Sequence, residues 1–337
     1  MSTLDTFSRP LKDLRISVTD RCNFRCPYCM PAEIFGERYQ FLPRKELLSF
    51  EEITRLARIF ANLGVTKIRL TGGEPLLRTG LPELVKMLSE VSGIEDLALT
   101  TNGFLLDKHA EELKEAGLNR ITISMDSLDN AVFQQMNGRG FSTDQVLSGI
   151  EAAERAGLNP IKINAVIQRS VNDHSIVDLV NHFKTKGHIV RFIEFMDVGT
   201  LNGWDLEQVV PANEIVNIVG KEHPIEPVTA NYSGEVALRY RFTDGSGEFG
   251  IIPSVTQPFC STCTRMRLSP DGHFYTCLFS DKGFNIRDAL RDGQTDSSIE
   301  SLIRDIWTNR TDQYSQLRAS ISDKTTRPKV EMYHIGG

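Results

Sequence analysis

The sequence predicts an α/β protein: a partial, six-stranded β/α barrel with a smaller C-terminal α+β region. Through about residue 200, short segments rich in β-branched residues alternate with amphipathic helical segments. Such repeated β-α units imply parallel strands with right-handed crossovers. After about Gly203 the pattern changes to shorter strand-like pieces. We therefore expect one domain at residues 1–205 and a second region at residues 206–337. A doubly wound open sheet is the alternative fold.

The elements of the first region follow from local signals. Strands are expected at residues 14–19, 67–71, 96–101, 120–125, 161–167 and 190–195. Helices are expected at residues 50–63, 81–89, 107–116, 143–156 and 173–184. Four helical segments are followed by a glycine at the left-handed cap position, and these are Gly64, Gly117, Gly157 and Gly187. Ser49 and Glu52 have the spacing of a capping box that begins the first helix.

The second region combines short strands and helices. We expect helices at residues 211–219, 286–291 and 298–307, and strands near residue 228 and at residues 235–243 and 249–253. The run from Asp244 through Gly245 and Ser246 to Gly247 predicts a hairpin turn between the last two strands. This mixture predicts an α+β region.

Composition and charge limit the function classes. The chain has 337 residues and a net charge of −6, which argues against a general nucleic-acid binder. It has no run of eighteen apolar residues, and no apolar stretch precedes Arg9, so we expect neither a membrane span nor a signal peptide. We therefore expect a cytoplasmic protein. In that compartment cysteines bind metals or act in catalysis more often than they form disulfides.

All six cysteines fall into two groups of three. They are Cys22, Cys26 and Cys29 in the first triad and Cys260, Cys263 and Cys277 in the second triad. Three thiolates are one ligand short of a closed site, so two triads suggest two metal centres, each with an open position. The first triad favours a 4Fe–4S cluster over a zinc knuckle. For the second triad, spacing alone leaves a cluster and a Cys3His zinc site that uses His273 equally open.

Four cations interrupt the expected parallel strands. Buried parallel strands are usually apolar, and a charge there is costly unless it is paired or faces water. Arg15, Arg69, Lys162 and Arg191 each occupy such a position. Together they suggest a polar barrel interior that binds an anion, although each could instead pair with a carboxylate or lie in solvent. Lys67 has the same strand parity as Arg69 and could join them.

Two motifs of the first region resemble a known superfamily. The loop 22–29, with Tyr28 before its last cysteine, is similar to the signature loop of the radical S-adenosylmethionine superfamily. Thr71 and the following Gly-Gly-Glu-Pro resemble that superfamily's second motif. The resemblance implies a 4Fe–4S cluster whose open iron chelates the methionine part of S-adenosylmethionine. Reductive cleavage would then produce a 5′-deoxyadenosyl radical.

The second triad and its flanks resemble the GTP 3′,8-cyclase family of molybdenum cofactor biosynthesis. The resemblance includes the run 259–268 with Arg265 and Arg267, the strand 191–196 and the terminal glycines. It implies a second 4Fe–4S cluster whose open iron is bound by guanine. The implied reaction is radical cyclisation of GTP to 3′,8-cyclo-7,8-dihydroguanosine 5′-triphosphate, the first step of that pathway.

The same resemblance assigns residues to each ligand. The residues that it places on GTP are Arg15, Arg69, Thr100, Lys162, Arg265 and Arg267, and the strand argument adds Arg191. The residues that it places around S-adenosylmethionine are Tyr28, Gly73, Glu74, Ser124 and Met196, with Asn102 as a neighbour. Arg265, Arg267 and the tail glycines Gly336 and Gly337 are expected to act in catalysis, although chain ends are commonly disordered.

Partners and rival functions follow from the implied reaction. We expect GTP as substrate, a reductant protein such as flavodoxin or ferredoxin, and a downstream cyclic pyranopterin monophosphate synthase. The family also suggests a homodimer, with no membrane or nucleic-acid partner. One rival is another radical enzyme with an auxiliary cluster, such as a peptide modifier. The other is a non-enzymatic module in which both triads bind structural zinc.

Overall fold

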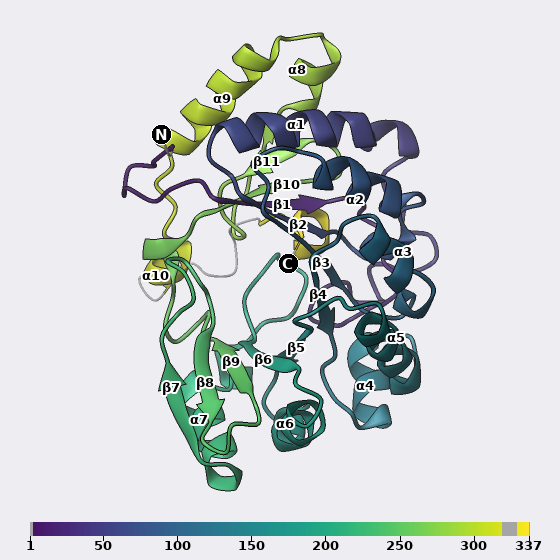
Figure 1. Ribbon diagram of the computed structural model, residues 1–337, viewed down its shortest axis with the longest axis vertical. Coiled ribbons are helices and arrows are strands. Elements are labelled where there is room, and N and C mark those ends of the chain that lie inside the picture. The colour runs from purple at the N-terminus through teal and green to yellow at the C-terminus, as the bar shows by residue number, and fades with distance from the viewer. Residues whose placement is uncertain (1–2, 319–328, 337) are drawn as a thin grey trace.

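The sheet of the protein is continuous and holds twelve strands. The computed structural model describes residues 3–318 and 329–336. Within them the strands are ordered β12-β11-β10-β1-β2-β3-β4-β5-β6-β9-β8-β7. The sheet is strongly curved (Figure 1). The mixed α/β class expected from the sequence is confirmed.

The six strands expected in the first region are present, adjacent and parallel. They are β1 (Asp13–Ser17), β2 (Lys67–Thr71), β3 (Asp96–Thr101), β4 (Arg120–Ser124), β5 (Lys162–Ile167) and β6 (Ile189–Glu194). Their spatial order follows their order in the chain and never reverses. A doubly wound sheet requires such a reversal at its switch point, so that alternative is wrong.

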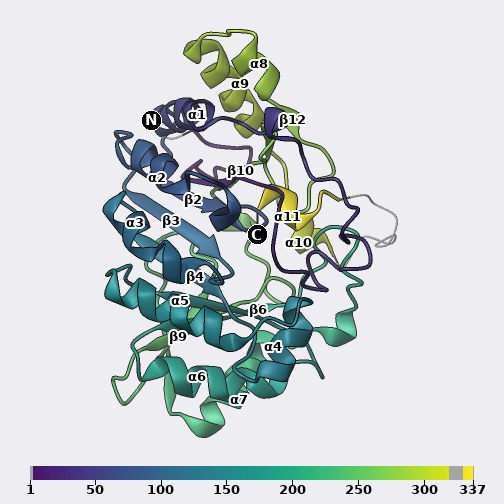
Figure 2. The same cartoon turned by 90° about the vertical axis from the view of Figure 1, so that its right-hand side faces the viewer.

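Helices cover the outer face of these strands (Figures 1 and 2). They are α1 (Phe50–Asn62), α2 (Leu81–Ser89), α3 (Ala110–Glu115), α4 (Asn130–Asn137), α5 (Thr143–Arg155) and α6 (Ile176–Lys184). The capping box of Ser49 and Glu52 is formed, and the four cap glycines all have positive φ. The sequence did not predict α4. It is short, and Asp129 begins it by accepting hydrogen bonds from the amides of Ala131 and Val132.

The C-terminal part of the chain extends both edges of this sheet. Its strands are β7 (Ile225–Val228), β8 (Leu238–Phe242), β9 (Glu248–Ile252), β10 (Arg265–Leu268), β11 (His273–Tyr275) and β12 (Phe284–Asn285). β10 pairs in parallel with β1, and β9 pairs in parallel with β6. The expected hairpin joins β8 and β9 as an antiparallel pair. The six parallel strands are therefore the centre of a larger sheet and not a separate six-stranded barrel.

The remaining helices lie around the two extended edges. They are α7 (Ala212–Glu222), α8 (Arg287–Arg291), α9 (Asp296–Thr308), α10 (Tyr314–Leu317) and α11 (Met332–Ile335). The short 3₁₀ helices are η1 (Arg44–Glu46), η2 (Pro75–Leu77), η3 (Leu106–Lys108), η4 (Asp173–Ser175), η5 (Leu206–Gln208) and η6 (Cys260–Thr262). α11 contacts β1 from the inner side of the sheet. Among the described residues, no helix has the length and apolar character needed to cross a bilayer.

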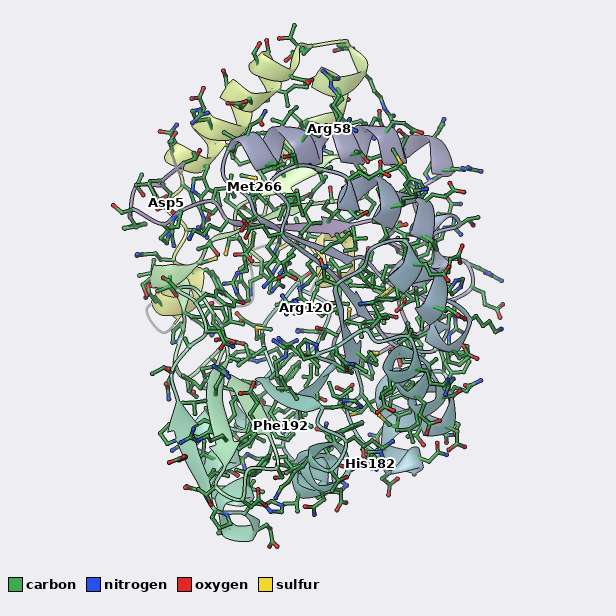
Figure 3. The ribbon with its side chains drawn as sticks, viewed as in Figure 1. Asp5, Arg58, Arg120, His182, Phe192 and Met266 are labelled. Atoms are coloured by element: carbon green, nitrogen blue, oxygen red, sulfur yellow. The ribbon has the colours of Figure 1, made fainter. Side chains whose placement is uncertain are left out.

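The inner and outer faces of the parallel strands differ in polarity. In β5, Ile163 and Ile167 are fully buried under the helices, whereas Lys162 and Asn164 point to the other face and are half-buried. In Figure 3, Met266 on β10 and Phe192 on β6 lie on opposite sides of the centre, and both are buried in the hydrophobic core. The strand cations expected from the sequence share the inner face.

Candidate active site

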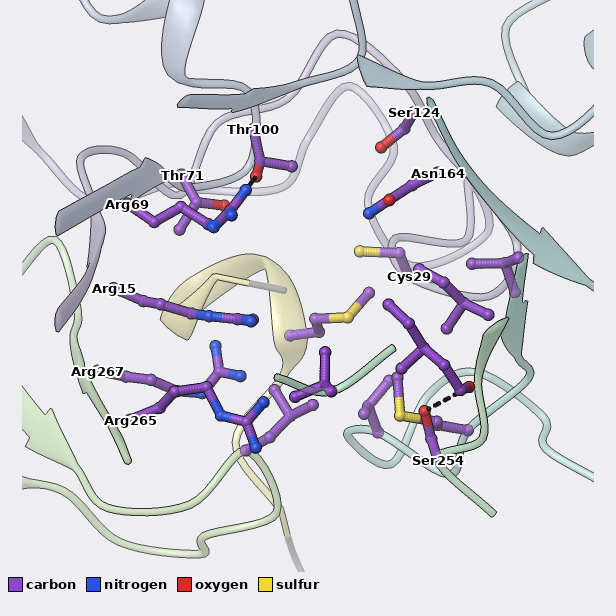
Figure 4. Close-up of a pocket in the computed structure, with 18 of the residues that line it drawn as sticks. Arg15, Cys29, Arg69, Thr71, Thr100, Ser124, Asn164, Ser254, Arg265 and Arg267 are labelled. Carbon is purple, nitrogen blue, oxygen red and sulfur yellow. Dashed lines mark hydrogen bonds between the residues drawn. The ribbon is translucent and has the colours of Figure 1, made fainter. Parts of the chain in front are cut away.

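A cavity of about 330 Å³ lies inside the curved sheet. Its wall combines the inner face of the parallel strands, the loops that follow them, the second triad and the C-terminal helix α11. Both cysteine triads line it. In Figure 4, Arg15, Arg69, Arg265 and Arg267 gather at one end, and Cys29, Ser124 and Asn164 lie at the other. One cavity therefore connects the two cysteine triads, which are far apart in the sequence.

The first triad occupies the loop after β1. Its cysteines form no disulfides, and the amides of Cys29 and Met30 bond to the carbonyl of Cys26 at 2.9 and 2.8 Å. The sulfur of Cys22 accepts from the amide of Phe24 at 3.4 Å and from the side-chain amide of Asn102 at 3.9 Å. Burial, and then Glu74, raise the pKa of Cys22 to about 12. A bound metal would reverse this shift, because thiolates are its ligands.

The Gly-Gly-Glu-Pro segment packs directly on the cysteine loop. The amide of Gly73 bonds to the carbonyl of Thr19 at 2.8 Å, and a Cβ at Gly73 would lie 2.3 Å from the carbonyl oxygen of Arg21. This close approach requires glycine. The Glu74 carboxylate is buried and accepts from Thr101 at 2.7 Å and from the Asn102 amide at 2.7 Å. Gly73 therefore lines the cavity, whereas Glu74 does not and instead orients the loop after β3.

Tyr28 is oriented by a carboxylate that the sequence did not single out. Its hydroxyl donates to Asp126 Oδ2 at 2.7 Å, and the amide of Val166 donates to Asp126 Oδ1 at 2.9 Å. Burial raises the pKa of Asp126 to about 6. Asp126, Ser124, Asn164 and Met196 all line the cavity. Asp126 directly follows the carboxyl end of β4. Residues at that position of a β/α fold commonly belong to the active site, and this position could have identified Asp126 from the sequence.

The strand cations gather on the inner face because their strands are in register. Arg15 aligns with Arg69 on β2 and with Arg267 on β10. Arg69 donates to the hydroxyls of Thr100 at 2.9 Å and Thr122 at 3.1 Å. Arg191 donates to Asn164 at 2.9 Å and Thr122 at 3.2 Å. All of these partners are neutral, so the charges of the cations remain available to a ligand.

None of the four strand cations forms an ion pair with a described carboxylate, whereas Lys67 lies 3.8 Å from Asp13 and 3.4 Å from Asp96. Burial, Arg191, Arg120 and Arg69 lower the pKa of Lys162 to about 7. Burial and the neighbouring arginines Arg69 and Arg120 lower the pKa of Arg191 to about 9. Lys162 is half-buried and adjoins the cavity without lining it. The positive charges are crowded together, which favours a polyanionic ligand.

The second triad is surrounded by arginines. Nη2 of Arg265 lies 3.2 Å from the sulfur of Cys263, and Nη2 of Arg310 lies 3.3 Å from it. Burial opposes ionisation, but Arg265 and Arg310 together lower the pKa of Cys263 to about 6. Burial raises the pKa of Cys277 to about 12. Sequence reasoning did not find Arg310, which lies 47 residues after Cys263 and has no motif around it.

The histidine of the Cys3His alternative points elsewhere. Nδ1 of His273 lies 3.2 Å from Asp271, and His273 is not among the residues that line the cavity with the three cysteines. Within residues 3–318 and 329–336, no group of three or more His, Cys, Asp or Glu is arranged to hold a single metal ion. A 4Fe–4S cluster instead takes its thiolates on different irons. The donor set of three cysteines per triad fits such clusters.

The C-terminal tail enters the cavity. Met332 and Tyr333 line it, and the Tyr333 hydroxyl lies 2.9 Å from that of Tyr39. The carbonyl of Gly336 accepts from Nη1 of Arg267. Gly336 has a φ of +76°, and a Cβ there would lie 2.2 Å from Cγ2 of Thr71. Gly337 lies outside the described residues. The described tail is thus an ordered part of the wall.

The fold and the cysteine loop together define the class of protein. The model of the Radical SAM superfamily matches residues 16–183, and the model named Molybdenum Cofactor Synthesis C matches residues 188–316. The crystal structure of Streptococcus suis SuiB bound to the precursor peptide SuiA is similar, with a TM-score of 0.61 and 18% identity over 90% of this chain and 65% of that chain. SuiB bound to S-adenosylmethionine has a TM-score of 0.59, with 17% identity. At such identity these structures support the fold alone.

Curated relatives identify the particular family. The protein named GTP 3′,8-cyclase from Acidothermus cellulolyticus is 51% identical and covers 99% of this chain and 98% of its own length. The proteins of the same name from Staphylococcus haemolyticus and Staphylococcus aureus are 50% and 49% identical, with the same coverage. The chain therefore belongs to the GTP 3′,8-cyclase family.

Proposed function

We propose that the chain converts GTP to 3′,8-cyclo-7,8-dihydroguanosine 5′-triphosphate with S-adenosylmethionine, the first step of molybdenum cofactor biosynthesis. The observation that carries this proposal is a single cavity lined by two cysteine triads and by strand cations without described ion-pair partners. Relatives of about half-identical sequence along their whole length carry the name of this activity. In this proposal, GTP and both metal sites share one cavity.

The first triad is the proposed site of a 4Fe–4S cluster with S-adenosylmethionine. Cys22, Cys26 and Cys29 would hold the cluster, and with S-adenosylmethionine it would supply the radical chemistry that removes the 3′ hydrogen of the ribose. Tyr28, Gly73, Ser124 and Met196 line this end of the cavity and would position the adenosyl and methionine groups. Two carboxylates orient neighbouring residues. Glu74, behind the wall, orients Asn102, and Asp126, which itself lines the cavity, orients Tyr28.

The second triad is the proposed site of a second 4Fe–4S cluster beside guanine. Arg265 and Arg267 extend from β10 beside Arg15 (Figure 4), and Arg265 lies 3.2 Å from the sulfur of Cys263 in this triad. We propose that both arginines hold GTP at this cluster while C3′ of the ribose bonds to C8 of guanine. Gly336, bound to Arg267, and Gly337 would then complete the catalytic wall.

The strand cations are the proposed triphosphate site. Guanidinium groups bind phosphate oxygens with paired N–H donors, and a triphosphate needs several of them. Arg15, Arg69 and Arg191 line the cavity, and Thr100 supplies a hydroxyl next to Arg69. Lys162 adds a further positive charge, because a bound anion favours its protonated ammonium form. Binding of the triphosphate here directs the base toward the second triad and the ribose toward the first.

The wider assignments rest on the family and on chemistry. We propose that β1–β6 act as a six-stranded partial barrel, with residues 1–205 as the radical domain and residues 206–337 as the auxiliary-cluster and substrate region. Two family models match successive parts of the chain, which supports two regions, although these models separate between residues 183 and 188. Reductive cleavage needs an electron donor, for which a flavodoxin or ferredoxin is proposed. A cyclic pyranopterin monophosphate synthase would consume the product. A homodimer and a cytoplasmic location stay predictions from the sequence.

An anaerobic turnover assay tests the proposed activity. The reconstituted protein is given dithionite and S-adenosylmethionine, with GTP, ATP or no nucleotide. We expect GTP-dependent 5′-deoxyadenosine together with a product isomeric to GTP. Formation of 5′-deoxyadenosine without a GTP product would retain the superfamily and reject the substrate. Zinc in place of iron in the active preparation would contradict both metal assignments.

A further inference from the structure

Among the described residues, the two triads differ in the charge around their sulfurs. The Cys263 sulfur accepts hydrogen bonds from two guanidinium groups, those of Arg265 and Arg310, at 3.2 and 3.3 Å. In the described part of the first triad, the donors to sulfur include the neutral amides of Phe24 and Asn102. The carboxylate of Glu74 also acts on that triad, and so does the buried guanidinium of Arg25, which donates to backbone carbonyls and not to sulfur. Carboxylates lie near both triads, so the contrast is in the donors: guanidinium groups bond to sulfur at the second triad and neutral amides do so at the first.

Arg310 is held in place from several sides. It is 4% exposed, and its Nη1 donates to the carbonyl of Cys263 at 2.9 Å. Its guanidinium lies 3.4 Å from Asp5 Oδ2 and 3.2 Å from Asp312 Oδ2, and it stacks 4.6 Å from the centre of the Trp307 ring. These contacts fix the plane of the Arg310 guanidinium. Its N–H group is therefore held in position to bond to the sulfur of Cys263.

The N-terminal segment contacts the second triad as well. Asp5 pairs with Arg9 at 2.6 Å, and Arg9 donates to the carbonyl of Cys260 at 2.7 Å. Both side chains are buried, and Asp5 also faces Arg310. One carboxylate thus orients two arginines, which hold the backbone at two of the three cysteines of the second triad.

We propose that Arg310 raises the reduction potential of the second cluster relative to the first. The inference rests on the proposed function, because it requires a cluster at Cys260, Cys263 and Cys277. One-electron reduction makes a cluster more negative, and a fixed cation that donates a hydrogen bond to sulfur stabilises the reduced form. Arg310 is a positioning residue in this role, because it acts through Cys263 and not on the substrate.

Potentiometric titration of the reconstituted full-length protein, followed by EPR, tests this role. Dithionite is the reductant, and the two cluster signals are distinguished by comparison with a variant in which Cys22, Cys26 and Cys29 are alanine. Arg310→Gln should shift the midpoint potential of the second cluster to a more negative value and leave the first cluster unchanged. Arg310→Lys should shift it less, because it keeps the charge but cannot donate to both Cys263 atoms. Arg304→Gln is the control, because within the described part of the chain Arg304 bonds to Glu300 at 2.7 Å and to Thr3 at 3.4 Å and not to a cysteine.

The outcomes separate this inference from the proposed function. An unchanged potential in Arg310→Gln with full iron content would overturn the role of Arg310. If Arg310→Gln does not bind the second cluster, Arg310 is an assembly residue and the proposal is wrong. Wild-type protein without iron at the second triad would instead contradict the proposed function.

Discussion

Lys162 and its neighbours show how one residue responds to an anion. Burial, and then the charges of Arg191, Arg120 and Arg69, lower the pKa of Lys162 to about 7. The carboxylate of Glu235 acts in the opposite direction. A bound triphosphate favours the ammonium form and moves the pKa back toward its ordinary value.

GTP binding should therefore take up a proton at Lys162. Below pH 7 the ammonium is already present, so this residue adds no pH dependence there. Above pH 7 the empty site has lost the proton that the complex retains, so affinity should fall by up to about tenfold per pH unit. Calorimetry of GTP binding without S-adenosylmethionine, in buffers of different ionisation enthalpy, measures the uptake. The same slope in Lys162→Met would contradict the assignment, and the variant also corrects for titration of GTP itself.

Substitutions of Arg191 and Lys67 test the triphosphate site by comparison. Among the described residues Arg191 has neutral partners, whereas Lys67 has Asp13 and Asp96 nearby. Arg191→Met should weaken GTP binding by roughly 10- to 100-fold, as expected for one hydrogen bond between charged groups. Lys67→Met should have a smaller effect, because two carboxylates already offset its charge. Equal losses, measured as dissociation constants at constant salt, would refute the distinction.

Residue-level prediction from the sequence was possible where a motif or a charge within a strand marked the residue. The cost of a charge in a buried parallel strand indicated that Arg15, Arg69 and Arg191 face a polar interior, and the structure places these three on the wall of one cavity. Arg310 and Asp126 could not be predicted, because their roles depend on contacts with residues 47 and 98 positions away in the chain. Glu74 was expected near the cofactor, but its carboxylate is occupied by protein donors.

The tail is the element whose position depends most on distant contacts. Tyr314 donates to the Asp197 carboxylate at 2.6 Å, and Arg318 and Lys329 lie 2.8 and 2.9 Å from it. Arg318 and Lys329 are the described residues on either side of the gap at 319–328. Asp197 therefore fixes both sides of the segment that leads to α11. Glu331 adds bonds to the amide and hydroxyl of Thr200, both at 2.8 Å.

Asp197→Asn should release the tail. Among the described residues, Asp197 is the carboxylate that pairs with both Arg318 and Lys329, and removing one partner of a buried pair costs about 3–5 kcal/mol. We expect faster hydrogen exchange in residues 329–336 and a loss of cyclase turnover, with GTP affinity close to that of wild type. Asp205→Asn is a control from the same loop, because asparagine can still accept from the Glu207 amide. Lost turnover without faster exchange would show that Asp197 acts in some other way.

Sequence patterns predicted the regular elements better than the edge strands. β2, β3 and α2 begin and end where periodicity and caps predict. β10 was missed because Arg265 and Arg267 alternate with Met266 and Leu268 directly after two cysteines, which favoured a cluster loop. Its pairing with β1 joins residues some 250 positions apart, and no local pattern records such a pairing.

At the scale of the whole molecule, strands added at both edges of the parallel sheet enclose one cavity. β10 and β9 extend the two edges of the parallel sheet, and each brings part of the C-terminal region to the inner face. The second triad and the tail thereby reach the cavity that the first triad lines. The expectation of a smaller C-terminal region did not anticipate that it would continue the same sheet.

Iron content should divide equally between the two triads. The reconstituted protein should bind about eight irons per chain, as two 4Fe–4S clusters require. Replacing Cys22, Cys26 and Cys29 by alanine should leave about four, and replacing the second triad should also leave about four. Elemental analysis after gel filtration measures this. Iron loss from both sites in either variant, with the fold intact by circular dichroism, would contradict two independent centres.

The central claim is that one cavity holds the ribose of GTP beside the first triad while the base lies at the second. Turnover of GTP deuterated at C3′ tests it most directly, by mass spectrometry of the 5′-deoxyadenosine formed. We predict that the deuterium moves to 5′-deoxyadenosine, and that GTP deuterated at the other ribose carbons transfers none. Unlabelled 5′-deoxyadenosine from the 3′-deuterated substrate, with cyclised product formed, would contradict this placement of the nucleotide.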